Sequence, residues 1–256
     1  MGIYLNPGNE MFTSISRLED YVDKTGMIRV INAFIDRGNK YICVSRPRRF
    51  GKTFAGNMLA AYYSKGCDSR EIFDKFKISG EAAFAEKLNK YNVIKIDMNS
   101  EYQNTLEKGR LLKRLTREIV REMKAEFPEV EFEEEDSLAQ CILRVYAAKK
   151  ETFILLIDEY DVLVRETNVP KTLFDEYLSF LNGLFKSDTL WPAVSLAYLT
   201  GILPVVRDKV QSKLNNFEEY TILDADELAE FTGFTDADVQ RMCEKYGISF
   251  EECRRW

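Results

Sequence analysis

The segment 45–53 has residue types and a spacing that suit the binding of a nucleoside triphosphate. Its sequence, between an apolar run and a helical pattern, is Ser45-Arg46-Pro47-Arg48-Arg49-Phe50-Gly51-Lys52-Thr53. A phosphate-binding loop needs a strand that ends abruptly and a helix N-terminus whose amides face the anion. Gly51 would let the backbone approach the phosphates, Lys52 would reach the β- and γ-phosphates, and the Thr53 hydroxyl would ligate Mg²⁺. The general pattern has glycine where this chain has Arg46, so the loop alone leaves nucleotide binding open.

An acidic pair, Asp158-Glu159, is the second element that could take part in nucleotide chemistry. The preceding run 153–157 is continuously apolar, which is typical of a central strand buried on both faces. At its carboxyl end an Asp would hold Mg²⁺ through the ion's water shell, and a Glu would polarise an attacking water. The alternative is that Asp158 only caps the following helix. That alternative does not explain the glycine-lysine-threonine loop earlier in the chain.

A third polar residue, Thr200, follows the apolar run 194–199 and precedes Gly201. In P-loop ATPases of the additional-strand type, a polar residue at this place senses the γ-phosphate or orients water. Alone, Thr200-Gly201 would indicate only a strand end and a turn. Because the three elements occur in the order that such an ATPase requires, together they favour a P-loop ATPase.

The elements that must position these residues follow an α/β pattern, in which short apolar runs alternate with longer helical patterns. The expected strands are 41–45, 93–97, 153–158, 194–200 and, as a short fifth candidate, 220–223. The expected helices are 53–64, 106–124, 138–149, 173–185, 226–231 and 236–246. We therefore expect a P-loop NTPase three-layer sandwich with a parallel five-stranded sheet of the additional-strand (RecA/AAA-like) class. Residues 1–223 would form this core, and residues 224–256 would begin a small helical appendage, such as a lid or a winged-helix-like unit.

The composition excludes several kinds of catalysis. The chain of 256 residues has no histidine, which excludes Ser-His-Asp and Cys-His nucleophile systems and His-ligated zinc. Its five cysteines form no CxxC pair, so reduced thiols are expected. No signal-peptide pattern stands at the start, and no stretch approaches the roughly 20 apolar residues that span a bilayer, so we expect a cytoplasmic protein. The formal net charge of −6 gives no large basic surface, so direct nucleic-acid binding is not expected.

Five motifs together resemble a known family, the predicted AAA-ATPase-like family of bacterial proteins that are often fused to a C-terminal PD-(D/E)XK nuclease-like domain. The motifs are Tyr21-Val22-Asp23-Lys24-Thr25, the loop 45–53, Ile157-Asp158-Glu159-Tyr160-Asp161, Thr200-Gly201-Ile202-Leu203 and Leu214-Asn215-Asn216-Phe217. The resemblance covers nearly the whole chain, and in that family Arg at position 46 looks like the norm. It implies ATP and Mg²⁺ as ligands. It also implies a nuclease-like region beyond the point where this sequence stops, and we expect no nuclease centre within these residues.

The predicted site combines these motifs. The residues expected to bind the nucleotide are Asp23, Arg46, Pro47, Arg48, Arg49, Phe50, Gly51, Lys52 and Thr53. The expected catalytic residues are Lys52, Glu159 and Thr200, and the expected metal ligands are Thr53 and Asp158. Asp23 and Lys24 could instead form a helix-capping turn, and which of the three arginines lies near the nucleotide stays open. For Asp97, capping a helix is favoured over an auxiliary role in the site.

The expected reaction is ATP + H₂O → ADP + phosphate, with in-line attack by water. One rival is a nucleotide-dependent switch or scaffold that binds ATP and barely hydrolyses it. Another is a module that serves a separate nuclease, through self-association or through a C-terminal nuclease-like domain. The second carboxylate, Glu159, favours hydrolysis, because a protein that only binds ATP has no need of it.

Overall fold

A central parallel sheet of five strands organises the computed structural model, which describes residues 1–204, 215–224 and 226–255. The strands are β1 (Tyr41–Ser45), β2 (Asn92–Asp97), β3 (Phe153–Asp158), β4 (Val194–Gly201) and β5 (Glu218–Tyr220). Their order is β2-β3-β4-β1-β5, and all neighbours are parallel. Because β4 lies between β1 and β3, the α/β fold has the additional strand that the sequence predicts. Leu214 of the fifth motif lies outside the described residues.

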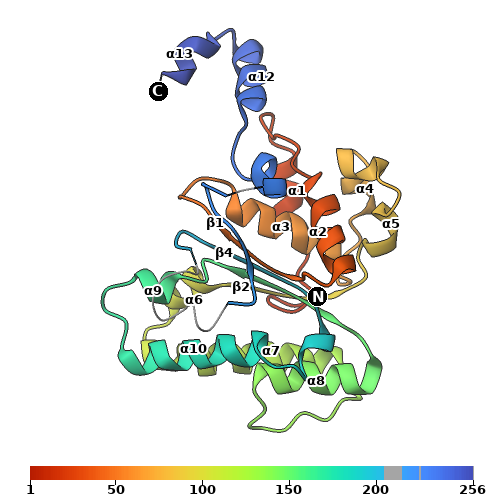
Figure 1. Ribbon diagram of the computed structural model, residues 1–256. Coiled ribbons are helices and arrows are strands. Elements are labelled where there is room, and N and C mark those ends of the chain that lie inside the picture. The colour runs from red at the N-terminus through yellow and green to blue at the C-terminus, as the bar shows by residue number, and fades with distance from the viewer. Residues whose placement is uncertain (205–214, 225, 256) are drawn as a thin grey trace.

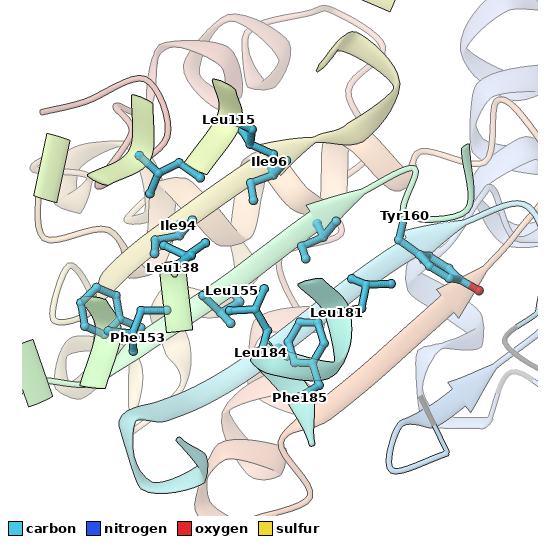
Figure 2. Close-up of a cluster of buried hydrophobic side chains, with 14 of the residues drawn as sticks. Ile94, Ile96, Leu115, Leu138, Phe153, Leu155, Tyr160, Leu181, Leu184 and Phe185 are labelled. Atoms are coloured by element: carbon cyan, nitrogen blue, oxygen red, sulfur yellow. The ribbon is translucent and has the colours of Figure 1, made fainter. Parts of the chain in front are cut away.

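Helices cover both faces of the sheet (Figure 1). On one face lie α1 (Glu10–Ser16), α2 (Met27–Arg37) and α3 (Lys52–Tyr63), and on the other lie α7 (Leu111–Glu126), α8 (Leu138–Lys149) and α10 (Lys171–Phe185). Successive strand residues point to opposite faces. In β1, Ile42 and Val44 therefore join the cluster under α2 and α3, whereas Tyr41 and Cys43 join the other cluster. Figure 2 shows part of that second cluster, which includes Phe153 and Leu155 of β3.

Short helices lie in the connections between these elements. They are α4 (Arg70–Phe73), η1 (Lys77–Gly80), α5 (Phe84–Lys87), α6 (Met98–Asn104), η2 (Lys108–Arg110), α9 (Val162–Arg165) and η3 (Trp191–Ala193). After the last strand come η4 (Asp226–Phe231), α12 (Asp236–Tyr246) and α13 (Phe250–Arg254). No helix in the described parts of the chain is long and apolar enough to cross a membrane.

Two predicted elements differ from the structure. The fifth strand ends at Tyr220, and the predicted strand 220–223 is instead a turn in which the Thr221 hydroxyl accepts hydrogen bonds from the amides of Leu223 and Asp224. The predicted helix 106–124 begins only at Leu111, because Leu106 is fully exposed and the preceding residues form η2.

The C-terminal helices are attached to the N-terminal segment that precedes α2. The residues of η4 pack on α2 through the buried Leu228. Helix α12 spans the predicted residues 236–246, with a capping box at Thr235 and Asp238 and Gly247 in the left-handed conformation at its end. Lys24 Nζ pairs with Asp238 Oδ2 at 2.6 Å. The boundary at residue 224 between a core and an appendage stays a prediction, and η4 and α12 both contact the core.

Candidate functional site

The loop between β1 and α3 has a backbone suited to holding an anion. Gly51 (φ 77°) and Arg49 (φ 71°) both have left-handed conformations. A Cβ at Gly51 would meet no described atom within 4 Å, so a side chain would not clash there. Glycine suits this position because of its left-handed backbone conformation. Gly51 also precedes the first turn of α3, which no side chain caps. The N-terminal amides of a 12-residue helix therefore point, without a side-chain cap, toward the loop.

Lys52 turns inward from the start of α3. Its Nζ donates to the carbonyl oxygens of Arg46 and Pro47, both at 3.0 Å, and lies 4.0 Å from Glu159 Oε1. The side chain is 5% exposed, and burial lowers the pKa of Lys52, against the opposing effect of the nearby carboxylates, with Glu159 first among them. The lysine is thus a buried cation held by the loop, close to the acidic pair.

Asp158 is the point at which three predicted residues meet. The Thr53 hydroxyl donates to its Oδ2 at 2.6 Å, and the Thr200 hydroxyl donates to its Oδ1. The Glu159 amide also donates to Oδ1, at 3.0 Å. Strands β3 and β4 are neighbours in the parallel sheet, and β1 lies beside β4, so their carboxyl ends share one edge. That edge is where the sequence pattern places the chemistry.

Glu159 lies beside this edge with its carboxylate between two cations. Its backbone is left-handed, with φ 52°. One oxygen pairs with Arg165 Nη2, and the other lies near Lys52. Burial raises the pKa of Glu159, whereas Arg165 and Lys52 oppose that rise. Sequence reasoning missed Arg165, although the spacing of Asp161 and Arg165 (i, i+4) on a short helix was a signal for an acidic–basic pair.

A cavity of about 1300 Å³ opens in front of these groups. Residues of the β1–α3 loop and polar residues near the strand ends line part of it: Arg48, Arg49, Phe50, Gly51, Lys52, Thr53, Asp97, Asn99, Asp158, Glu159 and Arg165. Apolar and aromatic residues in its lining include Phe12, Ile15, Tyr21, Val22, Met27, Met58, Phe231 and Phe234. Ligand pockets commonly hold about 300–1,000 Å³, so the cavity has room for a nucleotide. Its lining contains both cations, which suit phosphates, and aromatic side chains, which suit a flat base.

Three residues expected to bind the nucleotide do not line this cavity. Arg46 is 3% exposed, and its guanidinium donates to the Thr232 hydroxyl at 3.1 Å and to the carbonyls of Ser45 and Tyr220, both at 3.0 Å. Arg46 therefore fastens the loop to the neighbouring chain. Pro47 meets the site through its carbonyl, which accepts from Lys52.

Asp23 is likewise engaged within the protein. Its Oδ1 accepts from the amide and hydroxyl of Thr25, and its Oδ2 accepts from the Lys77 amide. It forms the turn before α2, the alternative that the sequence left open, whereas Lys24 lines the cavity. Asp97 caps α6, as favoured from the sequence, by accepting from the Ser100 amide at 2.9 Å.

Two residues that line the cavity, Thr53 and Asp158, also suit a magnesium ion bound together with a nucleotide. No group of three or more Cys, Asp or Glu side chains within residues 1–204, 215–224 and 226–255 is arranged to hold a metal ion alone. Mg²⁺ that binds with a nucleotide does not need one, because phosphates and waters supply most of its ligands. The Thr53 hydroxyl and Asp158 carboxylate provide two adjacent hard oxygens.

The chain is similar to several solved structures and matches one family model. The Aeropyrum pernix ORC2 protein (ADPNP-ADP complexes) matches with a TM-score of 0.43 and 9% identity, over 90% of this chain and 54% of that one. C. elegans PCH-2 matches with a TM-score of 0.32 and 15% identity, over 93% of this chain and 45% of that one. The chain thus spans about half the length of each. No curated protein sequence matches it. Residues 8–211 match the family described as Predicted AAA-ATPase, and because that match spans most of its length, the chain belongs to this family.

Proposed function

We propose that the chain binds ATP with Mg²⁺ and hydrolyses it to ADP and phosphate. The observation that carries the proposal is the meeting of Thr53 and Thr200 on the Asp158 carboxylate, with Lys52 and Glu159 beside it in one cavity. A capping role for Asp158 would not bring two hydroxyls, one from the first turn of α3 and one from the end of β4, onto its two oxygens.

Each residue would have a separate part in binding. The uncapped N-terminus of α3 and the Gly51 turn would bind the phosphates through backbone amides. Lys52 would exchange the loop carbonyls for phosphate oxygens. Thr53 and Asp158 would hold Mg²⁺, which, when bound, neutralises charge on the phosphates. The aromatic and apolar residues that line the cavity would contact the adenine base.

In the hydrolysis step Glu159 would orient the attacking water and accept its proton. Burial raises the pKa of Glu159, which makes it a better base than an exposed carboxylate. Thr200 would report the γ-phosphate through its hydroxyl, which already lies on Asp158. A cytoplasmic location, and service to a nuclease-like domain or to a second copy, belong to the same proposal and come from the family resemblance.

Calorimetric titration of ATP and ADP, with Mg²⁺, into the wild type and two variants tests the proposal, with phosphate release measured on the same samples. Lys52→Ala should lose most of the affinity, and Glu159→Gln should bind ATP but release phosphate at least about a hundredfold more slowly. The exposed residues Lys75 and Glu166 supply matched controls, Lys75→Ala and Glu166→Gln, which should behave as the wild type.

Other outcomes would change the conclusion. Binding that survives Lys52→Ala unchanged would contradict the site. Tight binding by the wild type without phosphate release would indicate the alternative function, a nucleotide-dependent switch with little hydrolysis. Absence of binding by the wild type would refute both functions.

A further inference from the structure

Arg165 is a charged residue of the cavity to which the proposed reaction has so far given no part. It ends the short helix α9, directly after the β3 strand that carries Asp158. Its side chain is 15% exposed and lines the same cavity as Lys52, Thr53 and Glu159. A guanidinium that is largely removed from solvent is costly unless it is paired, and here it has two partners.

The two partners of Arg165 differ in how firmly they are held. Asp161 is 1% exposed, and its Oδ2 lies 3.0 Å from Arg165 Nε while also accepting from the amides of Ile202 and Leu203, at 3.0 and 2.8 Å. Among the residues that the structure describes, the Glu159 carboxylate has no such anchor, and its oxygens face Arg165 and, at 4.0 Å, Lys52. Asp161 therefore pairs with the Nε side of the guanidinium, and Glu159 pairs with its terminal Nη2.

This arrangement occupies the Glu159 carboxylate before a nucleotide arrives. One oxygen pairs with Arg165 Nη2 and the other lies 4.0 Å from Lys52 Nζ, so a water that approaches Glu159 meets oxygens that already face cations. The Glu159 backbone is also held at φ 52°, a conformation that is unfavourable for a non-glycine residue. The pair of Glu159 and Arg165 helps to keep that conformation populated.

An incoming triphosphate would compete with Glu159 for Arg165. Three carboxylates, Asp158, Glu159 and Asp161, already surround the two cations of the site. The γ-phosphate brings further negative charge and several acceptor oxygens to the same cavity, and a planar guanidinium binds phosphate at least as well as carboxylate.

We propose that Arg165 exchanges partners when ATP binds: it leaves Glu159, keeps Asp161 and contacts the γ-phosphate. The exchange frees the Glu159 carboxylate for the attacking water only when a γ-phosphate is present, and it adds a cation at the transferred group. This inference rests on the proposed function. It makes Arg165 both the residue that distinguishes ATP from ADP and the residue that restrains the base in the resting protein.

The test measures nucleotide preference, so that it does not depend on activity alone. Affinities for ADP and for the β,γ-imido analogue of ATP are measured with Mg²⁺ for the wild type, Arg165→Gln and Arg165→Lys. We expect Arg165→Gln to lose about tenfold in affinity for the analogue, because a charge-assisted hydrogen bond is lost and release from Glu159 offsets part of it. Affinity for ADP should stay within about twofold, and phosphate release from ATP should fall.

Two further variants separate this role from a structural one. Arg165→Lys keeps the charge and should retain part of the preference for the analogue. Arg144→Gln is the matched control, since Arg144 also pairs with two carboxylates, those of Glu133 and Asp136, but lines no part of the cavity. It should change neither affinity. Thermal melting shows which variants are folded.

Three results would overturn the exchange. One is an Arg165→Gln variant that keeps the full preference for the analogue. Another is a folded variant that loses affinity for both nucleotides equally. A third is faster hydrolysis in Arg165→Gln, which would make Arg165 a restraint without a phosphate contact. A wild type that binds neither nucleotide would refute the proposed function itself. A wild type that binds both nucleotides, with an Arg165→Gln variant that binds them equally well, would refute only the exchange.

Discussion

Asp238→Asn removes a carboxylate that fastens α12 to the wall of the cavity. Its Oδ2 accepts from Lys24 Nζ at 2.6 Å and from the amide and hydroxyl of Thr235 at 2.9 and 2.8 Å. Burial raises the pKa of Asp238, but these hydrogen bonds lower it by more, from 3.8 to about 2. At about 1.36 kcal/mol per pKa unit, this shift stabilises the folded state by roughly 2 kcal/mol at neutral pH.

The pH dependence gives the prediction its sign. Because the folded-state pKa is depressed, the contribution of Asp238 is fully present above about pH 5 and is lost as the pH falls through about 2, so roughly half should remain at pH 3. Urea unfolding of the wild type and Asp238→Asn at pH 7 and pH 3 should therefore show a deficit of about 2 kcal/mol that shrinks to about 1.

The exposed Asp236, in the same first turn of α12, provides the control. Asp236→Asn should cost less than about 0.5 kcal/mol at either pH, apart from a small helix-dipole effect. The reasoning is refuted if the two variants lose equal stability, or if the deficit of Asp238→Asn is the same at both pH values.

Two further substitutions test the packing beside the site. Gly201→Ala would place a Cβ 2.7 Å from a ring carbon of Tyr160 and 2.9 Å from Asp161 Oδ1, both in buried residues, so it should lower the free energy of unfolding by about 1–3 kcal/mol in urea titration; an unchanged midpoint would contradict the close approach. The hydroxyl of Tyr198, which is 1% exposed, has no hydrogen-bond partner among the described residues, so Tyr198→Phe should leave stability unchanged or raise it by up to about 1 kcal/mol. A loss of more than about 1 kcal/mol would show that the hydroxyl is bonded.

The strands that carry the site could be predicted because burial on both faces leaves a clear trace in the sequence. Residues of β1 and β3 are buried throughout, so each reads as a continuous apolar run that ends at a polar residue. The carboxyl ends of neighbouring parallel strands meet at one edge of the sheet. Thr53, Asp158 and Thr200, which the sequence singled out separately, therefore lie within hydrogen-bonding distance of one another around Asp158.

The misplaced fifth strand shows where the pattern fails. Strand β5 reads Glu218-Glu219-Tyr220 and has one buried residue, because it lies at the sheet edge and is specified by its pairing with β1. The apolar residues that follow, Ile222 and Leu223, are 58% and 95% exposed. Hydrophobicity alone therefore placed the strand at 220–223, although its residues 221–223 lie outside β5. The pairing with β1, which the sequence does not show, sets the true bounds.

Arg46 and Arg165 show a second limit, which concerns charge. Both are arginines, and their place in the sequence put Arg46, but not Arg165, among the expected nucleotide-binding residues. In the structure the Arg46 guanidinium donates hydrogen bonds to the carbonyls of Ser45 and Tyr220 and to the Thr232 hydroxyl, whereas Arg165 lines the cavity. The difference depends on where distant backbone carbonyls lie, and no local spacing encodes that.

The polar groups of the site are paired with one another, and this has a consequence for binding. Lys52 holds two carbonyls, Thr53 holds Asp158, and Arg165 holds Glu159. Buried polar groups must be paired whether or not a ligand is present, because an unpaired one costs about 1–3 kcal/mol. A nucleotide bound here would therefore have to replace existing hydrogen bonds, and only the difference in free energy between the old and new partners would contribute to affinity. Affinity is therefore highest for a ligand group that binds these cations more strongly than the carbonyls and carboxylates they now contact. A phosphate is such a group, because its charge is higher.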